Sequence, residues 1–283
     1  MLHSILHALE HALTDGVKLI PFLFLTYLAM EWLEHKAGDK VNGFVRKSGK
    51  IGPLAGGVLG VVPQCGFSAA ASNFYAGRVI TLGTLLAIYL STSDEMLPIL
   101  ISSRAPLALI LKILLAKAAI GVAAGFLVDF CFRKKLPEHE HIHELCEHDH
   151  CDCAKGIWKS ALIHTVKIAI FILLIGFALE LFFEFAGEEA LAGLILNRPV
   201  LGPILAGLVG LVPNCASSVA ITELYLEGAL GVGSMLAGLL VNAGVGLLVL
   251  FKVNPDKKEN LRILGLLYLI GVSAGILISL AAG

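Results

Sequence analysis

The order of apolar and polar positions divides the chain into long hydrophobic segments separated by short polar clusters. Continuous apolar runs lie at about 17–34, 106–130, 161–183, 229–251 and 263–282. Each approaches or exceeds the roughly 20 residues with which an α-helix crosses the hydrocarbon core of a bilayer. A further apolar segment, at 80–102, corresponds to the run at 229–251. The pattern predicts an all-α, polytopic membrane protein.

Two other apolar stretches, 51–76 and 201–227, are each divided in the middle by a proline with small polar neighbours. Each arm would be about 18 Å long as a helix, which is too short to cross a membrane alone. We therefore expect two half-length helices that meet near the midplane as a re-entrant hairpin, buried in protein or facing a cavity. With these pairs the chain has about ten membrane segments.

The same pattern occurs twice in the chain. Residues 52–90 align with 202–240 at a constant offset of 150, and 14 of these 39 positions are identical. Each copy has a Pro-polar-Cys-small element at its division, at Pro63–Gly66 and at Pro213–Ala216. A duplicated membrane unit with an interrupted helix in each copy is typical of secondary transporters.

The distribution of basic residues predicts that the two repeats have inverted topologies. The expected organisation is a first membrane repeat at 1–130, a linker at 131–157 and a second repeat at 158–283. If each divided stretch enters and leaves on one side, 15 basic residues gather on one side of the membrane. They lie in the linker with its flanking Lys159, in the loops at 35–50 and 252–262, and at Arg78. Only two basic residues fall on the other side. Because basic loops stay in the cytoplasm, the linker is expected to be cytoplasmic and both termini outside.

The composition agrees with a membrane protein and excludes several function classes. Hydrophobic residues make up 57% of the 283 positions and charged residues 15%, whereas about 25% of the residues in a soluble domain are charged. The net charge of −1 gives no indication of a nucleic-acid partner. The sequence contains no phosphate-binding glycine loop. Its one G-x-S-x-G match, Gly271–Gly275, falls inside the apolar run at 263–282 and not at a strand-to-helix turn, and its one H-E-x-x-H match, His139–His143, falls in the polar linker and not in a predicted helix, so neither has the setting that its chemistry needs. We therefore expect no enzyme activity, and transport driven by an ion or proton gradient.

The two Pro-x-Cys divisions carry the first candidate site. In the inverted arrangement they enter from opposite faces and meet near one point. The candidate substrate-binding residues are Gln64, Cys65, Ser68, Asn214, Cys215 and Ser218. N–H groups at the beginning of each second arm favour an anion, whereas carbonyl groups freed at the division favour a cation. Thiolates favour a soft ion such as Zn²⁺, Cd²⁺, Cu⁺ or trivalent arsenic. Alternatively, each cysteine is a small apolar filler at a tight helix crossing.

Polar residues within the predicted segments form the second group of candidates. An ionisable group in a membrane span costs about 2.5–3.5 kcal/mol and is therefore expected to have a function. We predict that these residues couple transport to ions or protons: Asp94, Glu95, Glu223, Asn242, Glu31 and Glu180. One alternative is structural pairing with a membrane lysine, namely Lys112, Lys117, Lys18 or Lys167. For Glu31 and Glu180, another is a side chain that reaches water from the end of its span.

The third candidate is a metal-binding tract at 138–153 in the linker. Imidazole and thiolate groups are protein ligands for Zn²⁺ and related ions. The tract supplies His139, His141, His143, Cys146, His148, His150, Cys151 and Cys153. Because the spacing matches no fixed finger motif, we expect a flexible site for a Zn²⁺-like divalent metal, and no cofactor that the protein requires. The alternative is a solvated acidic linker.

The chain resembles a known family in two regions. The first is Thr14–Leu28 with the following Glu31, Glu34 and His35, and the second is the pair of Gly-Pro…Val-Pro-x-Cys repeats. Both resemble the ten-transmembrane heavy-metal exporter family, whose members are labelled as arsenic efflux proteins or manganese transporters. The resemblance implies export of a metal ion or metalloid across the bacterial inner membrane. It does not identify the ion, and two thiols fit a manganese site poorly, because Mn²⁺ prefers oxygen ligands.

Together these observations predict an inner-membrane secondary transporter that exports a heavy-metal ion or metalloid, held between the two Pro-x-Cys tips. One alternative is a transporter of an anion such as arsenite, an organoarsenical or another oxyanion. A second alternative is a metal-regulated channel or sensor. The expected partners are the metal ion or metalloid and the lipid bilayer, and the sequence leaves self-association into a homo-oligomer open.

Overall fold

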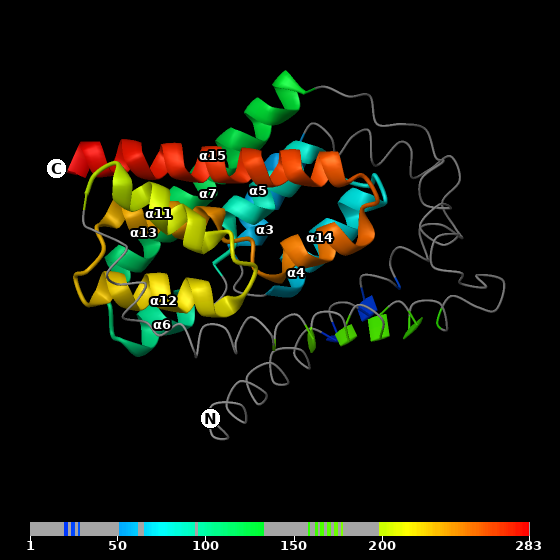
Figure 1. The fold of residues 1–283 in the computed structure, drawn as a ribbon, viewed down its shortest axis with the longest axis horizontal. Coiled ribbons are helices and arrows are strands. Elements are labelled where there is room, and N and C mark those ends of the chain that lie inside the picture. The colour runs from blue at the N-terminus through cyan, green and yellow to red at the C-terminus, as the bar shows by residue number, and fades with distance from the viewer. Residues whose placement is uncertain are drawn as a thin grey trace.

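The computed structural model describes residues 51–61, 65–93, 96–132 and 198–282, together with single residues within 20–28 and 158–177. These parts are helical and contain no strand, which confirms the predicted all-α class (Figure 1). In chain order, the helices are α3 (Gly52–Gly60), α4 (Cys65–Ala76), α5 (Leu82–Ser91), α6 (Met96–Ser102), α7 (Leu107–Cys131), α11 (Leu201–Gly210), α12 (Cys215–Leu226), α13 (Val232–Val241), α14 (Val245–Val253) and α15 (Lys257–Ala282).

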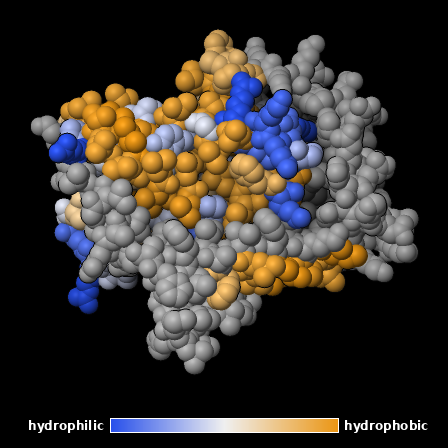
Figure 2. All heavy atoms as spheres, in the orientation of Figure 1, coloured by the Kyte–Doolittle hydropathy of each residue, from blue (hydrophilic) through white to orange (hydrophobic). Residues whose placement is uncertain are grey.

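Four helical stretches are long and apolar enough to cross a membrane: Leu82–Ser102, Leu107–Cys131, Val232–Val253 and Lys257–Ala281. The Val232–Val253 stretch is 89% buried within the protein, whereas Leu107–Cys131 and Lys257–Ala281 are only 28% buried. Figure 2 shows hydrophobic side chains covering much of the described surface, with hydrophilic ones gathered beside the beginning of α15. Apolar helices that are exposed to this extent require a lipid environment, so the chain is a multi-pass membrane protein.

The helices of the two halves correspond in position and in packing. α4 and α12 begin and end 150 residues apart, and so do α5 and α13. A Cβ added to Gly57 in α3 would lie 2.4 Å from Cγ2 of Val122 in α7, and one added to Gly207 in α11 would lie 2.5 Å from Cγ2 of Val272 in α15. Because these distances are too short for a real Cβ, both close helix crossings depend on glycine.

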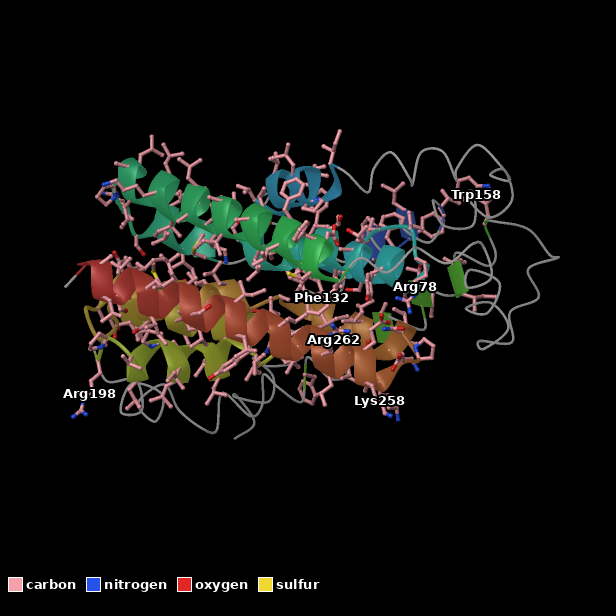
Figure 3. The ribbon with its side chains drawn as sticks, turned by 90° about the horizontal axis from the view of Figure 1, so that it is seen from above. Arg78, Phe132, Trp158, Arg198, Lys258 and Arg262 are labelled. Atoms are coloured by element: carbon pink, nitrogen blue, oxygen red, sulfur yellow. The ribbon has the colours of Figure 1, made fainter. Side chains whose placement is uncertain are left out.

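Helices of one half also pack against helices of the other. α4 lies against α14, and α12 lies against α6, so each half places one short helix on its partner. Phe132 directly follows α7, and Arg262 lies near the beginning of α15. The guanidinium carbon of Arg262 lies over the Phe132 ring, 4.1 Å from the ring centroid. The end of α7 therefore meets the beginning of α15, and the two long helices run in opposite directions (Figure 3).

Each of the predicted segments 80–102 and 229–251 differs from the expected continuous helix. α5 ends at Ser91 and α6 begins at Met96, and α13 ends at Val241 and α14 begins at Val245. We call Thr92 and Ser93, the described residues that follow α5, the first interruption and residues 242–244 the second. In the second, Gly244 has a φ of 54°, which glycine adopts without strain. The side-chain oxygen of Asn242 accepts the N–H of Gly244 at 2.8 Å, which replaces a helical hydrogen bond.

Candidate functional site

The second Pro-x-Cys division, residues 211–216, is here called the second tip. Asn214 has extended backbone (φ −140°, ψ 153°) and precedes the first turn of α12. Ser217 in that turn donates its hydroxyl to the carbonyl oxygen of Asn214 at 2.7 Å and lies 3.1 Å from that of Val212. Asn214 is 9% exposed and Ser218 is 3% exposed. The tip is therefore a hydrogen-bonded turn with a buried Asn214, and it leads into a helix N-terminus.

The second tip is joined to the second interruption. Nδ2 of Asn242 donates to Oγ of Ser217 at 3.0 Å, and Asn242 is 5% exposed. The side-chain amide of Asn242 is thus hydrogen-bonded to Gly244 within the second interruption and to Ser217 at the second tip. Non-helical backbone inside a membrane protein needs such internal partners. Asn242 is one of the predicted coupling residues, and the structure gives it a positioning contact at the tip.

The first half has a corresponding connection. The first tip comprises residues 61–66, of which 62–64 lie outside the described residues. Ser93, in the first interruption, donates its hydroxyl to the carbonyl oxygen of Val61 at 2.7 Å. The hydroxyl of Thr92 donates to the carbonyl oxygen of Ile88 at 2.8 Å, at the end of α5. In both halves, therefore, an interrupted helix is hydrogen-bonded to the tip of its own half.

The two halves meet where α4 lies on α14. Oγ of Ser72 lies 2.7 Å from the carbonyl oxygen of Gly246 and 2.7 Å from the hydroxyl of Tyr89, and the Tyr89 hydroxyl lies 3.1 Å from the same carbonyl. A Cβ on Gly246 would lie 2.7 Å from Cβ of Ser68, so backbone and side chain are in direct contact there. Ser68, Ser72 and Tyr89 are fully buried. The first turns of α4 are thus fixed two residues beyond the second interruption.

The predicted site residues fall into three groups in the structure. Ser68, Asn214, Ser218 and Asn242 are buried at or beside the tips and interruptions. Glu223 is exposed on α12 and is not part of this buried group. Outside the described residues lie Gln64, Asp94, Glu95, Glu31, Glu180, the linker tract at 138–153, and the side chains of Cys65 and Cys215. Among the described residues, no group of three His, Cys, Asp or Glu side chains is arranged to hold a metal ion.

Sequence reasoning missed the hydroxyl groups that connect these parts. Ser217, Ser72 and Ser93 each bond a backbone carbonyl or the side chain of another helix or turn. Small hydroxyl residues are common in membrane helices, where they also bond their own helix, so their identity alone indicates no site. Their spacing does carry a signal, because Ser72 follows Ser68 by one helical turn and Ser217 lies two residues after Cys215.

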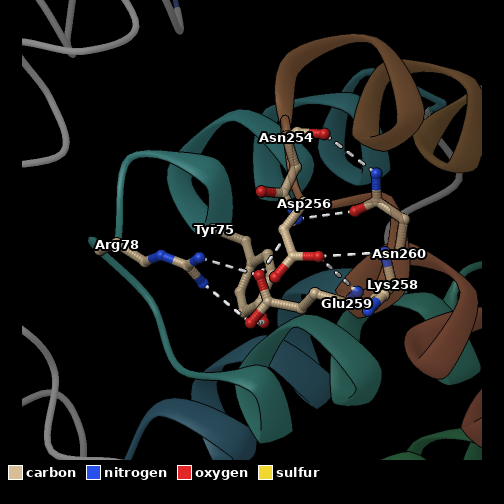
Figure 4. Close-up of polar contacts among 7 residues, drawn as sticks. All are labelled: Tyr75, Arg78, Asn254, Asp256, Lys258, Glu259 and Asn260. Atoms are coloured by element: carbon tan, nitrogen blue, oxygen red, sulfur yellow. Dashed lines mark hydrogen bonds and ion pairs between the residues drawn. The ribbon is translucent and has the colours of Figure 1, made fainter.

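A second polar cluster joins the halves at one end of the molecule (Figure 4). Arg78, which follows α4, donates to both carboxylate oxygens of Glu259 in the first turn of α15, at 3.1 and 2.8 Å. The hydroxyl of Tyr75 donates to Oε1 of Glu259 at 2.9 Å, and Nδ2 of Asn254 donates to Oε2 of Glu259 at 3.2 Å. We call this the Arg78–Glu259 bridge. Burial lowers the pKa of Arg78, but the hydrogen bonds and charge of Glu259 outweigh it, so the pKa is raised above its usual value.

Residues 5–187 match a family described as "Putative, 10TM heavy-metal exporter". This match covers more than half of the chain, so the protein belongs to that family. It confirms the resemblance seen in the first helix and the first Pro-x-Cys repeat. No curated protein and no solved structure matches the chain.

Proposed function

We propose that this member of the heavy-metal exporter family is a secondary transporter of the bacterial inner membrane, which exports a heavy-metal ion or metalloid from the cytoplasm. The substrate is held between the first and second tips. The observation that carries this proposal is the junction of tips and interruptions through Asn242, Ser217 and Ser93. Helix ends that meet inside the bundle provide the N–H and carbonyl groups with which transporters bind ions in the membrane.

The relation between the halves supports a mechanism of alternating access. Equivalent glycine crossings on α7 and α15, and the opposite directions of these two helices, are what an inverted repeat requires. In such a repeat, the two halves exchange conformations and open the central site to each side in turn. The mutual packing of α4 on α14 and of α12 on α6 gives each half a contact that moves with the other.

The chemistry at the tips favours a soft ion. Cys65 begins α4 and Cys215 begins α12, so the sequence places one cysteine at each tip where we propose that the substrate binds. Thiolates bind Zn²⁺, Cd²⁺, Cu⁺ and trivalent arsenic in preference to Mn²⁺ or Mg²⁺. Buried oxygen atoms of Asn214, Ser68 and Ser218 lie on the same turns and complete a mixed set of ligands.

The orientation follows from the basic residues. Figure 3 shows Arg78 and Lys258 toward one end of the described part and Arg198 at the opposite end. Under the positive-inside rule, the end with Arg78 and Lys258 faces the cytoplasm, as does the linker at 131–157. The Arg78–Glu259 bridge then closes the cytoplasmic side, and the substrate leaves toward the outside.

The test is transport by the reconstituted full-length protein, with Zn²⁺, Cd²⁺ and arsenite as probes in counterflow. We expect exchange of at least one probe, and its loss in Cys65→Ala and in Cys215→Ala. Cys131→Ala is the matched control, because Cys131 is exposed at the end of α7. Wild-type exchange in the double variant Cys65→Ala/Cys215→Ala would refute the tip site. If Cys→Ser variants retain exchange and Asn214→Ala loses it, the substrate is bound as an anion.

A further inference from the structure

One charged side chain lies inside the described membrane region without a role in the proposed site. Lys117 is the eleventh of the 25 residues of α7 and is 1% exposed. An ammonium group at this depth of a spanning helix is energetically costly, so Lys117 is a candidate for a function. Nζ of Lys117 donates a hydrogen bond to the carbonyl oxygen of Leu239 in α13, across the boundary between the halves.

The acceptor of this hydrogen bond lies at the broken end of a helix. α13 ends at Val241, so the carbonyl of Leu239 is among the last four, which lack partners within the helix. The N–H of Asn242 donates to the carbonyl oxygen of Gly238, and Nζ of Lys117 donates to the carbonyl oxygen of Leu239. The C-terminal carbonyls of interrupted helices are the groups that coordinate a cation in transporters. The Lys117 ammonium thus occupies a cation position.

This position is linked to the substrate tip. Asn242 follows Leu239 by three residues and donates to Ser217 in the first turn of α12, directly after Cys215. Any movement of the end of α13 therefore acts on Asn242 and, through it, on the second tip. The path from Lys117 to the tip contains one helix end and two hydrogen bonds.

The second half shows that an ammonium is not needed for packing here. The position equivalent to Lys117, at an offset of 150, is Leu267, which is 0% exposed and belongs to the hydrophobic core. A lysine stem and a leucine fill similar space in the two halves, but only the first half carries a charge. The packing that the two halves share therefore does not require the charge.

We propose that Lys117 couples transport to protons, an inference that rests on the proposed function. The protonated ammonium holds the carbonyl of Leu239 while the tips are empty. When a cation binds at the tips, like-charge repulsion drives the proton from the ammonium into the cytoplasmic water, and the neutral amine releases the end of α13. After the cation leaves outward, the amine takes a proton from the outside. One proton enters for each cation exported.

Other titratable groups near Lys117 belong to the same test. The helices with the most extensive contacts to α7 are α3, α5 and α13, and over their described lengths the only titratable side chain is Tyr89, which is bonded to Ser72 and Gly246. The beginning of α7 also shares a core cluster with α6 and α12, and α12 carries Glu223, while the end of α7 meets Arg262 of α15. Asp94 and Glu95 follow α5 and lie outside the described residues. The variants Asp94→Asn and Glu95→Gln are therefore measured beside those of Lys117.

The experiment compares Lys117→Leu, the residue of the equivalent position, with Lys117→Arg and with Lys112→Met, a control on the exposed side of α7. Reconstituted full-length protein is assayed for counterflow of Zn²⁺, Cd²⁺ and arsenite without a pH gradient, for accumulation driven by a pH gradient, and for proton movement. We expect Lys117→Leu to retain counterflow within about threefold but to lose gradient-driven accumulation by about tenfold or more. Lys117→Arg, which stays charged, loses counterflow at every pH. Lys112→Met behaves as wild type.

Two outcomes overturn the inference. One is wild-type proton movement in Lys117→Leu. The other, which decides the matter if Lys117→Leu does not fold, is counterflow by Lys117→Arg with an unchanged pH profile. A purely structural role of Lys117 would lower counterflow and accumulation equally and leave the pH profile in place. Absence of counterflow in the wild-type protein refutes the proposed function itself, so the two failures are distinguishable.

Discussion

The substitution Glu259→Gln is predicted to open the end of the protein that carries the Arg78–Glu259 bridge, which is the cytoplasmic end in the orientation that we propose. The carboxylate of Glu259 accepts two hydrogen bonds from Arg78, one from Tyr75 and one from Asn254. Arg78 and Tyr75 belong to the first half, whereas Glu259 and Asn254 belong to the second. The Arg78–Glu259 bridge therefore holds the halves together at this end and must break whenever the end opens (Figure 4).

The size of the effect follows from burial and from what glutamine retains. The side chains of Arg78 and Glu259 are 25% and 14% exposed, so the pair lies between a surface ion pair and a buried one. Surface pairs contribute about 0–1 kcal/mol, and hydrogen bonds to charged groups about 1.5–3 kcal/mol. Glutamine keeps one oxygen that accepts from Tyr75 or Asn254 but loses the two-fold contact with Arg78. We expect a loss of about 2 kcal/mol, which corresponds to an increase of about 30-fold in the open population.

The assay measures access to a buried reporter from the cytoplasmic side. Ser68→Cys provides the reporter, because Ser68 is 0% exposed, in a chain whose six native cysteines are replaced by serine. Inside-out vesicles are treated with a membrane-impermeant maleimide. Glu259→Gln should raise the labelling rate by about 30-fold if the open form is rare, because the rate then follows its population. Lys258→Gln, one residue away and exposed, is the control. Equal labelling rates in Glu259→Gln and the control would refute the reasoning.

Three further predictions concern packing, the tip and the linker. Gly207→Ala should destabilise the protein by about 1–3 kcal/mol, because its Cβ meets Val272, whereas Gly265→Ala, with open space around its Cβ, should not; thermal unfolding in detergent measures both. Asn242→Ala should lower counterflow and cost about 1–3 kcal/mol in stability by removing its bonds to Ser217 and Gly244, and unchanged values for both would contradict the role of this amide. Deletion of residues 138–153 should leave counterflow measurable. Calorimetry on a peptide of residues 135–156 should show Zn²⁺ binding that weakens below about pH 6, because protonated histidine does not bind the metal. A peptide without affinity for Zn²⁺ would disprove the metal tract.

Several features of the fold were predictable because local chemistry determines them. Proline and glycine mark helix ends through backbone sterics, so the divisions near Pro63 and Pro213 could be read directly, and α4 and α12 begin at Cys65 and Cys215. The length and hydropathy of α7 likewise identify a membrane span without any tertiary information.

The interruptions were not predictable by the same route. The run at 229–251 stays apolar apart from Ser234 and Asn242, and a hydropathy window cannot detect a break of three residues at 242–244. The helix ends there because the side chain of Asn242 forms a hydrogen bond with Ser217. Ser217 is distant in the sequence and comes close to Asn242 only in the folded state. The packing of α4 on α14 has the same origin, since the contact of Ser72 with Gly246 spans 174 positions. Local propensity contains no information on such pairs.

The two halves share their apolar packing but not their charges. Gly57 and Gly207 make equivalent crossings, whereas the positions equivalent to Arg78 and Glu259 are Gly228 and Leu109. Those two residues cannot form an ion pair, so the opposite end has no bridge of this kind at the equivalent described positions. A symmetric protein would have equal energies with either end closed and would move its substrate in both directions alike. Residues that break the symmetry set different energies for the two states. On this argument the Arg78–Glu259 bridge determines which end is closed at rest, and the buried charge of Lys117 determines which ion gradient changes it.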